Sequence, residues 1–222
     1  MKTRREQAIE AAIAVADAGG LDRVTMRSVA AQVGVTAMAL YPHVRDKETL
    51  LDGVVDHLLA EIYLGALRGP WQDRLSALGQ QIHELVLRHP GAAPLLFARP
   101  VITTRGLQVI DAMYGILLDA GTPPGEVARL ERFVSTALVG FAVSQVSGRF
   151  DSGSVSSAAR RQLLPAEMLP AHARLAQWLD EPVDWSAEFR ANLDDLTAVV
   201  ARSAGGRRSP RPDQGIATTT AP

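Results

Sequence analysis

The chain of 222 residues contains no cysteine, and aromatic residues make up only 5% of it. The absence of cysteine excludes disulfides, thiolate catalysis and every metal site that needs a cysteine ligand. It is compatible with a reducing compartment, and we expect a cytoplasmic protein. No uninterrupted apolar run approaches about 18 residues, so no membrane span and no membrane partner are predicted. The apolar run near the N-terminus is amphipathic, which argues against a secretory signal.

Charge of neither sign dominates, because 23 Lys and Arg stand against 24 Asp and Glu, for a net charge of −1. Bulk electrostatic attraction to nucleic acid is therefore not expected, although a local basic surface can still form. Residues 1–47 hold seven basic side chains against five acidic ones. This surplus is small, so we expect that binding to DNA would need two copies of the chain.

Strict alternation of apolar and polar residues, the pattern of half-buried strands, is almost absent. Apolar residues instead recur three and four positions apart between Gly and Pro breaks, which predicts an all-α fold. Gly19 and Gly20 end the first helix, and Thr25, Thr36 and Asp46 are candidate N-caps of the next three. Longer helices are predicted over 71–88, 92–98, 104–120, 125–149 and 185–202, with a shorter one near 173–179.

Two short helices, 26–33 and 36–41, are joined by a turn at Gly34 and match the helix-turn-helix pattern. Their apolar spacing leaves the first residues of the second helix exposed, where base edges would be met. These residues are Thr36, Ala37, Met38 and Ala39. Three of them lack a hydrogen-bonding side chain, so we expect recognition through thymine methyl groups and DNA shape. Pro42 is expected to interrupt the end of this helix.

The segment TMRSVAAQVGVTAMALYPHVRDKETLL, residues 25–51, resembles the N-terminal signature of the TetR family of bacterial transcriptional repressors. Thr, Arg, Gly, Leu-Tyr, His and Lys fall at the family's intervals without a gap, and the resemblance covers roughly the first 60 residues. The LYPHV segment and an extended Ser-rich loop over about 150–170 look closest to the tetracycline-repressor branch. One departure is Val44, which stands where Phe is common in the family.

The resemblance implies a homodimer that binds double-stranded DNA at a palindromic operator. It places phosphate contacts at Thr25, Arg27, Tyr41, His43 and Lys47. Such contacts fix the register on DNA without reading its sequence, and Arg27 is also the best candidate for a guanine contact. From the residues alone, Tyr41 could be half core, His43 could cap a helix end, and Lys47 could be a solvated charge.

Helices beyond this region are apolar on more than one face, as expected when they pack on two sides or line a cavity. The resemblance implies a pocket there for a small hydrophobic or amphipathic molecule. The candidate pocket residues are Leu58, Ile62, Tyr63, Gln81, Ile82, Leu85, Phe97, Val109, Met113, Leu117, Phe133, Thr136, Gln145 and Trp178. Each of them could instead be plain core.

Thr136, Gly140 and Ser144 form a stripe of small residues on helix 125–149, which lets another helix approach closely. With the apolar face of the last long helix, this stripe predicts a four-helix dimer interface, as the resemblance also implies. The candidate interface residues are Val134, Leu138, Phe141, Phe189, Leu193, Leu196 and Val200. The alternative is an ordinary monomeric core.

The sequence therefore predicts a DNA-binding domain at 1–47, a ligand-binding and dimerisation domain at 48–203, and a disordered tail at 204–222. The fourth helix is expected to end near Gly69. No catalytic residue, metal ligand or cofactor is predicted; His83 and Glu84 begin like a zinc-protease helix, but Leu87 stands where the second His is required. The expected function is that of a ligand-responsive repressor. The alternative is a helical small-molecule carrier that no longer binds DNA, and an enzyme comes third.

Overall fold

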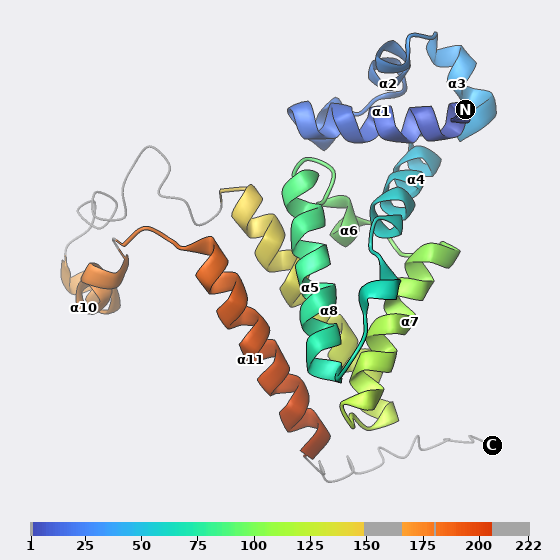
Figure 1. The fold of residues 1–222 in the computed structure, drawn as a ribbon. Coiled ribbons are helices and arrows are strands. Elements are labelled where there is room, and N and C mark those ends of the chain that lie inside the picture. Colours follow the sequence, from blue (N-terminus) through green and yellow to red (C-terminus); the bar gives the residue numbers. More distant parts are fainter. Residues whose placement is uncertain (1, 149–165, 180, 206–222) are drawn as a thin grey trace, which may run out of the picture.

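The computed structural model describes residues 2–148, 166–179 and 181–205, and within them every regular element is a helix. A small head of α1, α2 and α3 sits on one end of a larger bundle, into which α4 descends (Figure 1). The α-helices are α1 (Arg4–Gly19), α2 (Met26–Val33), α3 (Ala37–Val44), α4 (Lys47–Ala60), α5 (Trp71–Arg88), α6 (Leu95–Ala98), α7 (Thr104–Asp119), α8 (Pro124–Val146), α10 (Pro170–Leu179) and α11 (Trp185–Gly205). The 3-10 turns are η1 (Leu21–Arg23), η2 (Leu64–Ala66) and η3 (Ala166–Met168).

The head is held together by α1, whose alanine-rich face packs against α2, α3 and α4. A capping box starts α1, because Thr3 accepts the amide of Glu6 while the Glu6 carboxylate accepts the amide of Thr3. This cap also holds the pKa of Glu6 below its usual range, since the amide and hydroxyl of Thr3 stabilise the carboxylate. The small side chains on α1 allow the other helices to pack closely around it.

Among the first four helices, two C-terminal ends differ from the sequence-based expectation. α3 does not stop at Tyr41 but continues through Pro42 to Val44, where Leu40 and Val44 are buried and hold the last turn. α4 ends at Ala60, well before Gly69, because the Gln81 side chain accepts the Tyr63 amide at 2.6 Å and fixes a non-helical segment there. Both outcomes depend on tertiary contacts that a local pattern does not contain.

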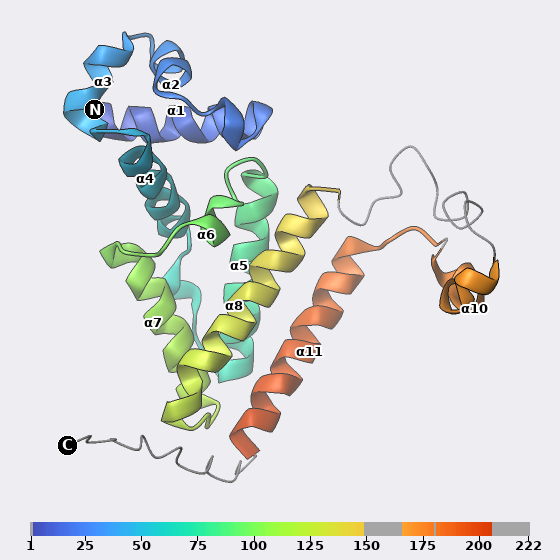
Figure 2. The same cartoon turned by 180° about the vertical axis from the view of Figure 1, so that it is seen from behind.

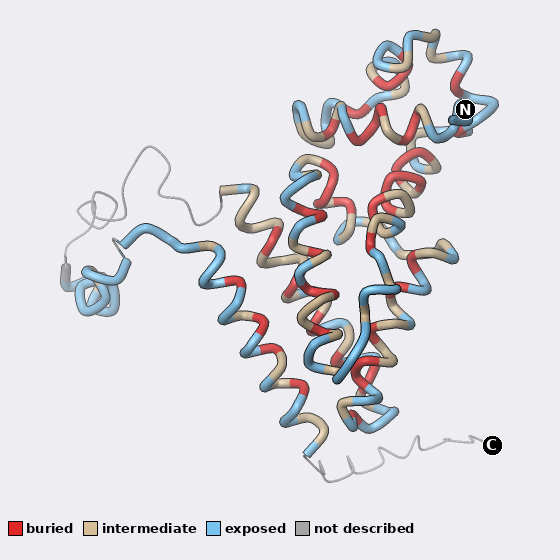
Figure 3. Tube along the Cα trace, in the orientation of Figure 1, coloured by how far each residue is buried: buried red, intermediate tan, exposed pale blue. Residues whose placement is uncertain are grey.

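In the bundle, α5 and α8 pack side by side, α7 covers both, and α11 lies along their outer side (Figures 1 and 2). Buried residues form stripes along the inward faces of these helices (Figure 3). α11 extends to Gly205, so the first two residues of the predicted tail belong to this helix; 206–222 lie outside the described residues. Most of the predicted Ser-rich loop, 149–165, also lies outside them. None of the described helices combines the length and apolarity needed to cross a bilayer.

Candidate DNA-binding head and ligand cavity

The turn between α2 and α3 is set by a left-handed glycine. Gly34 has φ +79° and ψ 32°, a conformation that costs other residues energy because of their Cβ. Its amide and that of Val35 donate to the carbonyls of Ala31 and Ala30 at 3.1 and 2.9 Å, which closes the end of α2. Thr25 caps the other end of α2 in a reciprocal pair with Ser28. Both ends of α2 are thereby fixed, and α3 leaves the turn in one direction.

α2 and α3, which carry most of the residues predicted to contact DNA, lie on the side of α1 that faces away from the bundle, whereas Lys47 begins α4 (Figure 1). Met38 is 75% exposed and Tyr41 43% exposed, whereas Leu40 between them is fully buried. The other exposed candidates are Thr25, Arg27, Thr36, Ala39 and His43. Ala37 and Lys47 are half-buried. This exposure leaves the start of α3 available to a DNA groove.

Two of the predicted cationic contacts are unpaired in the part of the chain that the structure describes. Arg27 and Lys47 form no ion pair there, whereas Lys2 binds Glu10 at 2.7 Å. Lys47 begins α4 directly after the N-cap Asp46, whose carboxylate accepts the Thr49 amide at 2.7 Å. That bond holds the pKa of Asp46 below its usual range. Arg27 and Lys47 are thus free to neutralise phosphates.

A polar junction, which the sequence reasoning missed, joins the head to the bundle. The His89 ring lies 3.0 Å from the Asp17 carboxylate in α1 and 3.1 Å from Glu61, just after α4. The other Asp17 oxygen accepts the amides of Gly91 and Ala92 at 2.9 and 3.1 Å. Charge spacing along the chain gives no signal for this cluster, since its members are far apart in sequence.

A second connection holds the N-terminal half of α4. The Arg99 guanidinium, at the end of α6, donates to Asp52 at 2.6 Å and to Glu48 at 2.7 Å. These carboxylates raise the pKa of Arg99 further and keep it charged. α4 is therefore held by α6 on one side and by the His89 junction at its end.

A cavity of about 290 Å³ lies in the bundle between α4, α5, α6, α7 and α8. Seven of the predicted pocket residues line it: Ile62, Ile82, Leu85, Phe97, Val109, Met113 and Thr136. The sequence reasoning missed the remaining lining residues: Leu59, Leu78, Leu96, Val101, Gly106, Ile110, Glu131, Ser135 and Val139. The four-residue spacing of Glu131, Ser135 and Val139 was a usable signal, because it places them on one face of α8.

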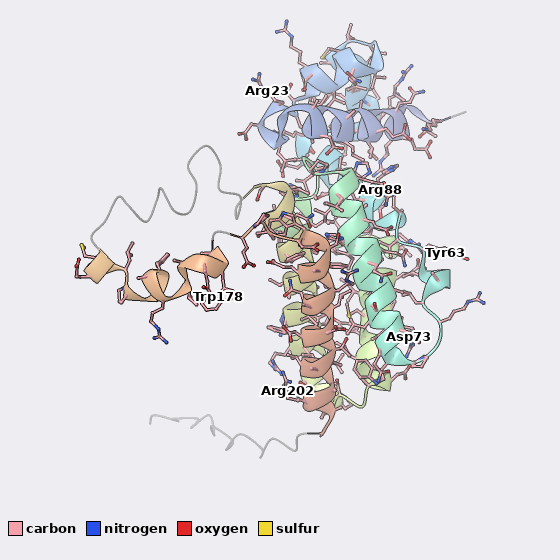
Figure 4. The ribbon with its side chains drawn as sticks, turned by 60° about the vertical axis from the view of Figure 1, so that its left-hand side comes forward. Arg23, Tyr63, Asp73, Arg88, Trp178 and Arg202 are labelled. Carbon is pink, nitrogen blue, oxygen red and sulfur yellow. The ribbon has the colours of Figure 1, made fainter. Side chains whose placement is uncertain are left out.

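The other predicted pocket residues lie elsewhere in the structure. Leu58 and Leu117 are fully buried in the core, and Tyr63 is 66% exposed and points away from the bundle (Figure 4). The Gln81 side chain bonds to the backbone of Tyr63, and Gln145 bonds to the His83 ring at 2.7 Å.

Two predicted pocket aromatics also fall outside this cavity. Trp178 is 58% exposed on α10, which stands apart from the bundle (Figure 4). Phe133 is 48% exposed and lines a separate groove between α8 and α11. Neither side chain contributes to the cavity in this single chain.

Most of the predicted interface residues are buried within the single chain. The structure places Val134, Leu138, Phe189, Leu193, Leu196 and Val200 between α8, α11 and α5, each 7% exposed or less. Phe141 is half-buried and stacks with Phe189 at 5.9 Å between ring centroids. The apolar surface left for a partner comes from their neighbours in the groove, Phe133, Ala137 and Val199. The described residues contain no group of three potential metal ligands.

A helix-turn-helix head on a helical bundle with an internal cavity defines a ligand-regulated class of DNA-binding protein. Two family models match the chain: bacterial regulatory proteins of the TetR family over residues 8–54, and the tetracyclin repressor-like C-terminal domain over residues 66–196. The second match alone spans more than half of the chain. The chain belongs to the TetR family of bacterial transcriptional regulators.

Relatives and solved structures agree with this assignment. An HTH-type transcriptional regulator of Saccharopolyspora erythraea is 27% identical over 202 residues, which cover 90% of this chain and 86% of the relative. The repressor DrrR1 of Streptomyces coeruleorubidus is 29% identical over 143 residues, 64% of this chain and 53% of the relative. The crystal structure of ActR from Streptomyces coelicolor with actinorhodin has the same fold, with a TM-score of 0.75, 23% identity, and coverage of 93% of this chain and 100% of ActR.

Proposed function

We propose that the chain is a homodimeric cytoplasmic repressor that leaves a palindromic operator when a small hydrophobic or amphipathic molecule enters the cavity. The observation that carries this proposal is the course of α4. This helix starts at Lys47, just after α3, and its last turn holds Leu59, which lines the cavity together with Ile62 two residues beyond the helix end. One rigid element therefore reaches both sites.

The contacts around α4 support a mechanical link between the two sites. Arg99 ties its first turns to α6, and α6 supplies Leu96 and Phe97 to the cavity wall. A ligand that pushes α6 or α7 outward would carry α4 and the head with it. The ligand must bind better to the DNA-incompetent arrangement, since equal affinity for both arrangements would shift nothing.

Dimerisation is needed because one head offers few cations and a short recognition surface. Two heads related by a two-fold axis would meet half-sites one helical turn or a multiple of it apart. The groove between α8 and α11 supplies an apolar surface for contact between the two subunits. A dimer is also typical of the family. Among the similar proteins, DrrR1 is named a transcriptional repressor, and the crystal structure of ActR contains actinorhodin.

The test is selection of bound duplexes from a random DNA pool by the full-length protein, at two salt concentrations. The proposal predicts enrichment of a palindrome, with retention falling as salt rises. Retention without sequence enrichment would contradict a repressor with an operator. No retention at either salt concentration would favour a small-molecule carrier built on the same helices.

A further inference from the structure

The cavity between α4 and α8 has apolar walls and one charged side chain. Glu131 on α8 is the only ionisable residue among those that line it in the described structure. Ser135 and Thr136, on the next turn of the same helix, also line the cavity and carry hydroxyl groups. All polar side chains among the described lining residues are therefore on α8, whereas α5 and α7 contribute apolar residues.

Glu131 has no cationic partner within the described residues. The arginines of the neighbouring helices are directed elsewhere: Arg105 donates to the carbonyl of Ile62, and Arg129 donates to Glu126 at 2.6 Å. Arg132 is exposed and points about 100° away from Glu131 around the helix. The fold thus leaves the half-buried Glu131 among the lining residues of a largely apolar cavity, without a cationic partner in the described residues.

An unpaired carboxylate in such a place has a physical consequence for binding. While the cavity is open, water can hydrate Glu131, but a ligand that fills the cavity displaces this water. A neutral or anionic ligand would leave the carboxylate desolvated without a partner, which is costly. A ligand with a positively charged N–H group would replace the lost hydration with a charge-assisted hydrogen bond.

We propose that the ligand of this cavity is a hydrophobic cation, an apolar body carrying a protonated amine that binds the Glu131 carboxylate. Ser135 and Thr136 accept its remaining hydrogen bonds, and the aliphatic wall holds the body. The volume of about 290 Å³ lies at the small end of ligand pockets and fits a single aromatic or short branched body. This inference rests on the proposed function only in taking the cavity as the ligand site.

The experiment uses three probes of one shape and different charge: phenylbutylamine, phenylbutanol and phenylbutanoate. Binding to the full-length protein is measured by calorimetry without DNA, so that a failure of the operator proposal cannot mask the result. The variants are Glu131→Gln, which removes the charge in the cavity, and Glu84→Gln as the matched control. Glu84 is exposed on α5 and does not line the cavity, yet its substitution changes the net charge equally.

We expect phenylbutylamine to bind the wild type more tightly than the other two probes. Glu131→Gln should weaken the amine by at least about tenfold, while Glu84→Gln alters neither probe. Phenylbutanol should bind Glu131→Gln at least as tightly as the wild type, because the variant has no carboxylate to desolvate. Retained phenylbutanol binding also shows that the variant cavity is intact. The inference is overturned if the amine binds the wild type no better than the alcohol, or equally well to wild type and Glu131→Gln.

Discussion

Lys47 lies where the head meets the bundle, since it starts α4 just after α3. Its ammonium forms no ion pair among the described residues, and Asp46 fixes the helix turn that positions it. If Lys47 neutralises one phosphate, Lys47→Ala should weaken binding to all DNA sequences alike. The plot of log affinity against log salt should flatten by about one unit per monomer.

The matched control is Arg202→Ala, which removes the same charge from the opposite end of the bundle (Figure 4). We expect this variant to keep the wild-type salt slope on the same duplexes. An unchanged slope for Lys47→Ala would mean that Lys47 is only a solvated surface charge. A loss that depends on the DNA sequence would assign Lys47 to base reading instead.

At the scale of elements, the turn before α3 depends on the backbone conformation of Gly34 rather than on space. A Cβ at Gly34 would meet nothing within 4 Å, but its φ of +79° disfavours any other residue. Gly34→Ala should therefore lower the free energy of unfolding by about 1 kcal/mol and weaken DNA binding. Gly115→Ala, inside α7 and with equally open space around it, should instead raise the free energy of unfolding by about 0.5–1 kcal/mol. Urea unfolding measures both, and equal effects would contradict this role of Gly34.

Apolar periodicity and capping residues predicted most of the helices but not how the helices pack against one another. The helix over 71–88 and the caps at Thr25 and Asp46 follow from periodicity and capping chemistry, and the structure confirms them. The predicted end of α4 was wrong. The observed end depends on the hydrogen bond from the Tyr63 amide to Gln81, which lies 18 residues further along the chain. Periodicity also found the apolar faces of α8 and α11. It could not show that these faces cover each other within one chain.

For the candidate sites too, features within one segment of the chain could be predicted, whereas features built from several helices could be predicted only in part. The residues predicted to contact DNA lie in one segment, 25–47, so the exposure of most of them could be inferred from helix geometry and the family resemblance. The cavity is assembled from five helices, and sequence reasoning found seven of its lining residues but missed nine, among them Glu131 and Ser135. Gln81 and Gln145 were predicted to line the pocket. In the structure the Gln81 side chain bonds to the backbone of Tyr63, and the Gln145 side chain bonds to the His83 ring.

At the scale of the whole molecule, the His89 junction fixes the head to the bundle. His89→Ala removes contacts to Asp17 and Glu61, whose side chains are only 23% and 24% exposed. We expect a loss of about 1–2 kcal/mol in the free energy of unfolding and faster hydrogen exchange at the end of α1. His172→Ala, at an exposed position on α10, should change neither. Equal exchange rates in both variants would show that the junction does not hold the head.

If filling the cavity releases the operator, a group attached inside the cavity should do the same, and the absence of native cysteine allows a direct test. Ser135→Cys places a single thiol in the cavity, where benzyl methanethiosulfonate attaches a benzyl group through a reducible disulfide; Ser186→Cys, exposed on α11, is the control. The measurement is fluorescence anisotropy of the selected operator duplex. Modified Ser135→Cys should lose affinity at least about tenfold and regain it on reduction, while modified Ser186→Cys binds normally. Unchanged operator affinity after complete modification of Ser135→Cys would contradict the account.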